Sequence, residues 1–116
     1  MEKTIEAKPS NRRRSPRRRP RGSVKLECRR GSSGLGLNLT VAVLDLADTG
    51  VRLIVKEALD VPAEVEILIS GYGISKSIRR LATVRWQLRL DNGSYCVGVE
   101  FQKQLQYREW QVLAAP

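Results

Sequence analysis

Residues 82–101, ATVRWQLRLDNGSYCVGVEF, decide the fold class of this chain. Apolar and polar side chains alternate in a run from Ile78 to Leu90 and again from Tyr95 to Phe101, and this period of two is typical of half-buried β-strands. Asn92-Gly93 lies between the runs and favours a tight turn, because both residues tolerate the positive φ angles that such turns need. The stretch therefore predicts an antiparallel β-hairpin.

Toward the N-terminus the sequence predicts four further strands, and the first two of them show the same two-residue period. They span Ser23–Arg29, Leu35–Leu46, Val51–Val55 and Val65–Ile69. In the longest of these strands we expect alternate side chains to share one face of the sheet, namely Leu35, Leu37, Leu39, Val41 and Val43. Residues 102–114 have apolar side chains at helical spacing instead, so they predict a short helix.

Six short strands with one apolar face each favour a closed sheet, because closure removes unpaired edges. We therefore expect an all-β fold, a six-stranded antiparallel β-barrel with a C-terminal α-helix over one open end. In this fold we expect Trp86 in the core, and we expect Tyr107 and Trp110 to attach the helix to the barrel. Arg85 and Glu100 are expected to be partners on the solvent face of the sheet.

The positive charge of the chain is concentrated near its N-terminus. Residues 1–30 contain twelve Lys/Arg and three Glu, whereas residues 31–116 contain nine Lys/Arg and nine Asp/Glu, so the net charge of +9 belongs to the first part. Asn11–Arg21 holds seven arginines and no apolar side chain, and such a segment cannot fold alone. We expect residues 1–21 to form a flexible arginine-rich arm and residues 22–116 to form the barrel. A partner rich in phosphate is the simplest explanation of this arm.

Composition also argues against several classes of function. The chain has no histidine, which removes the commonest general base and metal ligand, and Cys28 and Cys96 alone make no zinc site. We expect both cysteines to be reduced, small buried side chains, and we expect no metal, no cofactor and no enzymatic activity. The sequence has neither an apolar window long enough for a membrane span nor a secretory signal, so we expect a cytoplasmic protein.

The stretch Asp45-Leu-Ala47-Asp-Thr-Gly50 interrupts the strand pattern and has two interpretations. As a β-turn, its Asp and Thr side chains bond to the local backbone, and Gly50 takes a backbone angle that other residues avoid. As a ligand site, Asp45 offers a carboxylate to the N1–H and N2–H edge of guanine, Ala47 leaves room for the ligand, and Gly50 allows close backbone approach. Taken alone, the stretch favours the turn.

The arginine run also has two interpretations. Either it is a solvated arm that attracts any polyanion, or it contains two arginines four residues apart that bind one particular phosphate or guanine. The second interpretation fits the chemistry of the side chain, because a guanidinium group matches phosphate oxygens and the O6/N7 edge of guanine with paired hydrogen bonds.

Together, the two stretches resemble the signature of the PilZ domain, the bacterial receptor for cyclic di-GMP. That signature is RxxxR in an N-terminal segment, followed by [D/N]-x-[S/A]-x-x-G after a strand. Arg13–Arg17 matches the first motif, and Asp45–Gly50 matches the second in its alanine variant. The resemblance continues through Val51-Arg52-Leu53, Val84-Arg85-Trp86 and Gly98-Val99-Glu100-Phe101, and it covers roughly residues 12–110.

The resemblance implies a six-stranded barrel with a C-terminal helix, on whose surface cyclic di-GMP lies under the arginine segment. It implies ligand contacts by the residues that match the two motifs, namely Arg13, Arg17, Asp45, Ala47 and Gly50. Ala47 replaces the serine of many family members, and the missing hydroxyl implies an affinity lower by one hydrogen bond, about 0.5–1.5 kcal/mol.

The register of the first motif has more than one solution. Arg14–Arg18 and Arg17–Arg21 also satisfy RxxxR. Val24-Lys25-Leu26 follows Arg17 at the offset usual in the family, which favours Arg13 and Arg17 as the ligand residues, with Arg14 and Arg18 as their neighbours.

From this resemblance we expect a receptor that changes its contacts with an unidentified partner protein when the arm orders on cyclic di-GMP. Two alternatives remain open. One is a small β-barrel nucleic-acid-binding protein with a cationic arm, although the neutral body and the few aromatic side chains argue against nucleic acid as the partner. The other is a PilZ-like adaptor that does not bind nucleotide.

Overall fold

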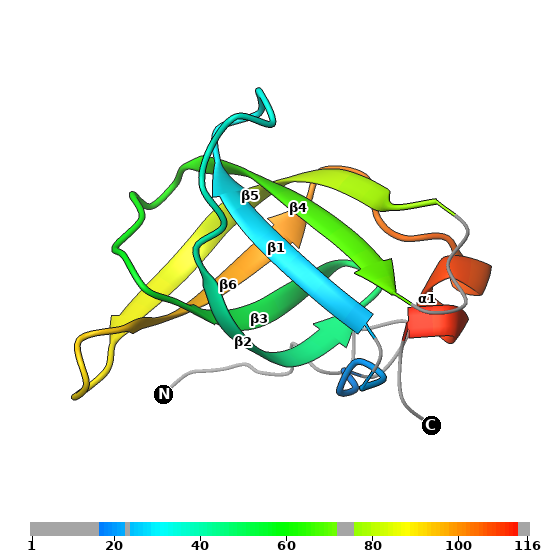
Figure 1. The fold of residues 1–116 in the computed structure, drawn as a ribbon, viewed down its shortest axis with the longest axis horizontal. Coiled ribbons are helices and arrows are strands. Elements are labelled where there is room, and N and C mark those ends of the chain that lie inside the picture. Colours follow the sequence, from blue (N-terminus) through cyan, green and yellow to red (C-terminus); the bar gives the residue numbers. More distant parts are fainter. Residues whose placement is uncertain (1–16, 23, 72–75, 114–116) are drawn as a thin grey trace, which may run out of the picture.

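The computed structural model describes residues 17–22, 24–71 and 76–113. They form six strands and one helix: β1 (Val24–Arg30), β2 (Thr40–Ala47), β3 (Gly50–Val55), β4 (Glu64–Gly71), β5 (Ile78–Arg89), β6 (Tyr95–Phe101) and α1 (Tyr107–Leu113). Neighbouring strands are antiparallel, in the order β1-β4-β5-β6-β3-β2. The sheet curls until its two edges approach each other, which confirms the predicted all-β barrel with a terminal helix (Figure 1).

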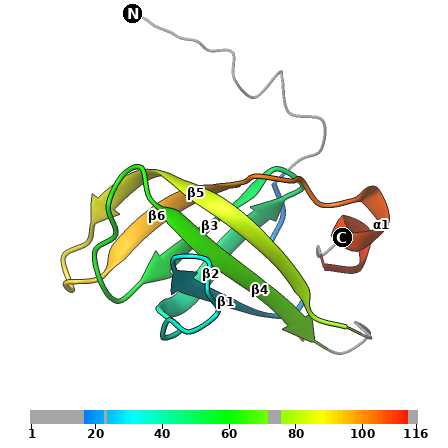
Figure 2. The ribbon, with the colours of Figure 1, turned by 90° about the horizontal axis from the view of Figure 1, so that it is seen from above.

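The barrel closes where β1 meets the chain that leads into β2. The Leu39 N–H donates to the Cys28 carbonyl over 2.8 Å, and the Cys28 N–H donates to Thr40 Oγ1 over 2.9 Å. Within the described residues, these two strands do not form a ladder of backbone pairs. The barrel is therefore nearly closed, and Figure 2 shows its curvature from above.

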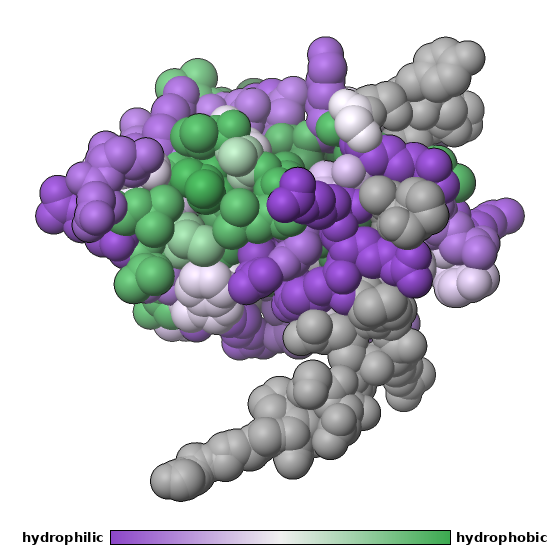
Figure 3. All heavy atoms as spheres, turned by 90° about the horizontal axis from the view of Figure 1, so that it is seen from below, coloured by the Kyte–Doolittle hydropathy of each residue, from purple (hydrophilic) through white to green (hydrophobic). Residues whose placement is uncertain are grey.

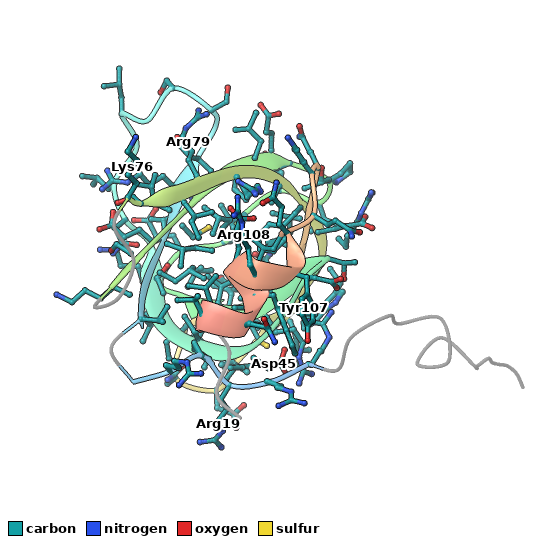
Figure 4. The ribbon with its side chains drawn as sticks, turned by 90° about the vertical axis from the view of Figure 1, so that its right-hand side faces the viewer. Arg19, Asp45, Lys76, Arg79, Tyr107 and Arg108 are labelled. Carbon is teal, nitrogen blue, oxygen red and sulfur yellow. The ribbon has the colours of Figure 1, made fainter. Side chains whose placement is uncertain are left out.

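Inward-facing side chains from all six strands fill the barrel, and α1 covers one end of it (Figure 4). Trp110 and Leu113 of α1 are buried, as expected for Trp110. Tyr107 is 69% exposed, so the prediction that it attaches the helix to the barrel is wrong. It begins the helix, and its side chain points away from the core. Within the described residues, no helix is long and apolar enough to cross a membrane.

β2 begins later than the alternation predicts. Residues 35–39 lie outside the strand, and Leu35 and Leu37 are 87% and 76% exposed whereas Leu39 is buried. The prediction of one strand from Leu35 with a single apolar face is therefore wrong. The preceding loop explains the difference, because positive φ angles of 75° at Gly31 and 78° at Gly34 turn the chain away from the sheet.

The alternation of β5 is broken by a bulge. Val84 lies opposite Val99 of β6, and the next paired residue, Trp86, lies opposite Gly98, so Arg85 is an extra residue on β5. A one-residue insertion moves the side chains that follow it to the other face of the sheet. Val84 is fully buried, but Trp86 is 41% exposed, so the prediction that Trp86 lies in the core is wrong.

The two cysteines also differ in burial. Cys28 of β1 is fully buried, as predicted, and burial raises the pKa of its thiol to about 11. Cys96 of β6 is free and half-buried, because its neighbour Val97 faces the core and Cys96 faces outward. The prediction of a buried Cys96 is therefore wrong.

The end of the arginine run lies against the barrel. The Arg18 N–H donates to the Leu46 carbonyl (2.9 Å) and the Leu46 N–H donates to the Arg18 carbonyl (2.6 Å), which pairs this residue with β2. The Arg21 N–H donates to the Leu113 carbonyl at the end of α1 (2.8 Å). Residues 17–21, expected to be part of a flexible arm, are thus fixed to β2 and α1. The rest of that arm, residues 1–16, lies outside the described residues.

Candidate functional site

Asp45 is the centre of a charged cluster on the outer face of the barrel. It lies near the end of β2, directly opposite Arg52 of β3. Arg52 donates to Asp45 Oδ2 through Nε (2.9 Å) and through Nη2, and Arg17 donates from Nη1 to Oδ1 (3.2 Å). One carboxylate therefore bonds to two arginines from different parts of the chain. Figure 4 shows Asp45 next to the N-terminal segment, which runs below α1.

The surroundings of Asp45 keep it ionised. Burial alone raises the pKa of this carboxyl, since only 9% of the residue is exposed, but the hydrogen bonds and charges of Arg52 and Arg17 outweigh burial and leave the pKa below its usual value. The hydrogen bond to Asp45 in turn raises the pKa of Arg52. Asp45 is thus a fixed negative charge that orients two guanidinium groups.

Arg17 and Arg18 are neighbours in the sequence but reach different places. The Arg17 guanidinium bonds to Asp45, whereas the Arg18 guanidinium lies over the ring of Trp110, 5.4 Å from its centroid. The extended backbone explains the separation, because successive side chains of such a segment point to opposite sides. Arg13 and Arg14, the other predicted arginines, lie outside the described residues.

An open pocket of about 350 Å³ lies beside the charged cluster. Its walls come from the N-terminal segment, the β2–β3 turn, β5 and β6, through Arg17, Thr49, Gly50, Arg85, Trp86, Gly98, Val99 and Glu100. The volume falls in the lower part of the range of roughly 300–1,000 Å³ found for small-molecule sites. Arg17 belongs to both features, because it lines the pocket and bonds to Asp45.

Trp86 depends on Gly98 for its place in this pocket. The two residues are opposite each other on β5 and β6, and a Cβ on Gly98 would lie 2.2 Å from Trp86 Nε1. Only glycine at position 98 therefore lets the indole lie on the backbone of β6. An exposed indole offers an apolar ring face on which a base can stack.

The bulge also places Arg85 at the pocket, next to Trp86. Arg85 donates to Glu100 Oε1 from Nε (2.7 Å), and its Nη2 lies 2.6 Å from the same oxygen. Both side chains are more than half exposed, which confirms the prediction that they are partners on the solvent face. Their charges cancel, so the positive charge of the pocket comes from Arg17.

Gly50 and Ala47 serve the hairpin that carries Asp45. A Cβ on Gly50 would lie 2.2 Å from the Val99 carbonyl oxygen, so glycine is needed for close approach of β3 to β6. The described glycines with positive φ do not include Gly50, so the backbone angle proposed for it in the turn interpretation is wrong. Ala47 is fully buried in the core.

Sequence reasoning gave Arg52 no role in the site and misassigned Trp86 to the core. Arg52 had a usable signal, because a two-residue turn at Asp48-Thr49 places position 52 opposite position 45. Trp86 had a weaker one, a glycine across the β5–β6 hairpin at position 98. Neither residue belongs to one of the two motifs, so both signals depend on inferring the strand registers.

Comparison with models of known families matches residues 11–115 of the chain to the PilZ domain. No curated protein matches the chain. The match covers both motifs and nearly the whole chain, and the barrel with its terminal helix agrees with it. The chain therefore belongs to the PilZ domain family, a family of binding and adaptor domains known for the recognition of cyclic di-GMP.

Proposed function

We propose that this chain is a receptor for cyclic di-GMP, which binds in the pocket beside Arg17. The observation that carries the proposal is the double role of Arg17, which lines the pocket and is held there by Asp45. These two residues belong to the two motifs of the family. Cyclic di-GMP offers phosphates and guanines, and a guanidinium group forms paired hydrogen bonds with either.

The residues around the pocket take different parts in this proposal. Arg17 contacts the ligand, and Arg13 adds a second guanidinium from the N-terminal segment. Asp45 acts through Arg17, because both of its oxygens already accept from arginines. A direct bond from Asp45 to guanine requires one of these pairs to open. Trp86 stacks on a base, since its indole is exposed at the pocket.

The other predicted residues have supporting roles. Gly50 keeps the hairpin close to β6, and Ala47 lies behind it in the core. Arg18, with Arg14 as the other neighbour, adds charge near the site, but its side chain lies on Trp110. This arrangement supports the register Arg13–Arg17 over Arg14–Arg18.

We propose that the receptor is non-enzymatic and cytoplasmic, and that the ligand changes its contacts with a partner protein. The path of the N-terminal segment supports this, because the same segment bonds to Asp45 through Arg17 and to the end of α1 through Arg21. A ligand that contacts Arg17 while Asp45 holds it therefore acts on a segment that is attached to α1.

Isothermal titration calorimetry of the full chain with cyclic di-GMP tests the proposal. We expect saturable binding that Arg17→Ala weakens by about tenfold or more, because a hydrogen bond to a charged group contributes roughly 1.5–3 kcal/mol. Arg18→Ala removes the same charge from the neighbouring position and serves as the matched control. We expect it to weaken binding by less than about threefold.

Three results would contradict this assignment. Equal losses for the two variants mean that only the charge of the segment matters. No binding heat at high ligand concentration favours an adaptor without nucleotide. Steeply salt-dependent binding to random DNA, unchanged by Asp45→Ala, favours a nucleic-acid-binding protein.

A further inference from the structure

A row of apolar side chains crosses the outer face of the barrel next to the pocket. The strand registers align Ala42 of β2 with Ile54 of β3, Ile54 with Cys96 of β6, and Cys96 with Leu88 of β5. Ile54 and Cys96 face outward, since their neighbours Leu53, Val55 and Val97 are buried in the core. Ala42 and Leu88 are paired with them and share that face. An outer face of an antiparallel sheet is normally polar, so this row needs a separate explanation.

Neighbouring residues widen the row into a face. Irregular pairing in β2 brings Val41, 60% exposed, and Leu44, 37% exposed, to the same side. Leu88 is 61% exposed, and Trp86 continues the face to the pocket. We call this surface the outer apolar face: Val41, Ala42, Leu44, Ile54, Trp86, Leu88 and Cys96. Figure 3 shows apolar side chains gathered on the underside of the barrel, between hydrophilic surfaces on both sides.

Positive charge borders the outer apolar face at its pocket side. There Arg17 and Arg52 both bond to Asp45, and residues 17–22 carry four arginines and no acidic side chain. Residues 1–22, which lead into β1, carry nine Lys/Arg and two Glu, a net charge of +7.

We propose that the outer apolar face binds a segment of a partner protein that presents apolar side chains flanked by Asp or Glu. Apolar contacts supply the affinity, and the acidic flanks match the arginines at the border. The row crosses four strands about 4.8 Å apart, so it is roughly 14 Å long. That length fits two to three turns of an amphipathic helix, whose pitch is about 5.4 Å.

Two other occupants fit this surface less well. A second copy of the chain brings another +9 toward the same arginines, and like charges repel. An anionic membrane favours apolar side chains that protrude, and the most exposed leucines, Leu35 and Leu37, belong instead to the β1–β2 loop at the top of Figure 1. The outer apolar face lies on the body of the sheet.

Trp86 belongs both to the pocket and to the outer apolar face. A base that stacks on the indole changes the border of the docking surface, which gives the ligand a direct route to the partner. This coupling rests on the proposed function, whereas the docking of the segment does not.

The two cysteines allow the surface to be monitored in the unmodified chain. Cys96 is half-buried in the middle of the row, whereas Cys28 is fully buried and has a pKa of about 11. At neutral pH iodoacetamide therefore modifies Cys96 in preference to Cys28. A segment that covers the row slows this modification.

The probe is a library of short random peptides displayed on phage and selected on the full chain, with counter-selection on Leu88→Glu. We expect enriched peptides with apolar residues at i, i+4 and i+7 and with Asp or Glu at their flanks. A synthetic peptide of this kind slows the modification of Cys96 in the wild type. Leu88→Glu weakens its binding by about tenfold or more, and so does the milder Leu88→Thr. Leu35→Glu, the matched control on the exposed loop, leaves binding unchanged.

Several outcomes overturn the proposal. They are the absence of any peptide that slows the modification of Cys96, basic rather than acidic flanks, and equal binding to Leu88→Glu. Protection of Cys96 by higher protein concentration alone identifies a second copy as the occupant, and protection by phosphatidylserine vesicles identifies a membrane. Titration of Leu88→Glu with cyclic di-GMP separates the two proposals, because we expect its nucleotide affinity to match the wild type whether or not the peptide binds.

Discussion

Asp45 and Glu66 are both nearly buried acids on the outside of the same barrel, and they use their arginines differently. Asp45 bonds through both oxygens to Arg17 and Arg52. Glu66 is 1% exposed and bonds through Oε2 to Arg79, while its Oε1 has no hydrogen-bond partner among the described residues. One acid is fully satisfied by two partners, and the other depends on one.

The surroundings of the two acids explain the difference. Arg79 also donates to the Ser32 carbonyl (2.8 Å), and a Cβ on Gly34 would lie 3.6 Å from Glu66 Oε1, so this pair fastens the β1–β2 loop to the sheet. Arg17 comes instead from the N-terminal segment and faces a pocket. A buried ion pair is therefore not a site by itself; what distinguishes Asp45 is that one of its arginines also reaches an open pocket.

The largest expected effect is a loss of stability when the Glu66–Arg79 ion pair is broken. Arg79→Ala leaves a buried carboxylate without its partner, and we expect it to lower the free energy of unfolding by about 2–3 kcal/mol. Arg17→Ala leaves Asp45 bonded to Arg52, so we expect a loss below about 1 kcal/mol. Urea unfolding of both variants, followed by circular dichroism, measures the difference.

A double variant provides the control for this comparison. Glu66→Leu combined with Arg79→Ala removes the buried charge together with its partner, and we expect it to regain much of the stability lost in Arg79→Ala. Equal losses for Arg79→Ala and Arg17→Ala would mean that the two pairs contribute alike, and the comparison would not hold.

The next largest effect is on ligand affinity, where we expect the change at Asp45 to matter more than the change at Glu66. Asp45→Asn keeps the shape of the side chain but removes the charge that holds Arg17, so we expect it to weaken cyclic di-GMP binding by about three- to tenfold. Glu66→Gln makes the same change at the acid whose arginine does not line the pocket, and we expect binding within about twofold of the wild type. Calorimetry measures both affinities. A larger loss in Glu66→Gln than in Asp45→Asn would contradict the proposed site.

Most of the fold was predictable because half-buried strands require apolar and polar residues to alternate in the sequence. β6 and the hairpin at Asn92-Gly93 follow the predicted alternation, β3 lies within one residue of its predicted bounds, and Gly93 has the positive φ angle, 89°, that its turn implies. Prediction failed where the chain leaves the regular pattern without a change of composition. The bulge after Val84 reverses the faces of β5, and no residue type marks it.

The site was predictable in part, for a related reason. Motif spacing identified Asp45 and Arg17, and the structure brings these two together. Arg52 and Trp86 reach the site only through strand pairing, which depends on register rather than on local sequence. Motif spacing identifies residues within the motifs, whereas the strand register determines which residues outside the motifs lie next to them.

The smallest expected effect is the dependence of stability on pH at Asp45. Arg52 and Arg17 hold the pKa of its carboxyl below its usual value in the folded chain, in spite of burial. Its contribution to stability is therefore present above the unfolded pKa, about 3.9, and is lost as the pH falls through the lower folded pKa. We expect Asp45→Asn to lose less stability than the wild type when urea unfolding is repeated from pH 5 down to about pH 2. Arg52→Ala removes the main opposing cause, so its acid branch should flatten in the same direction. Parallel acid branches for all three proteins would mean that Asp45 does not gain from its arginines, and the contrast with Glu66 would then rest on the pocket alone.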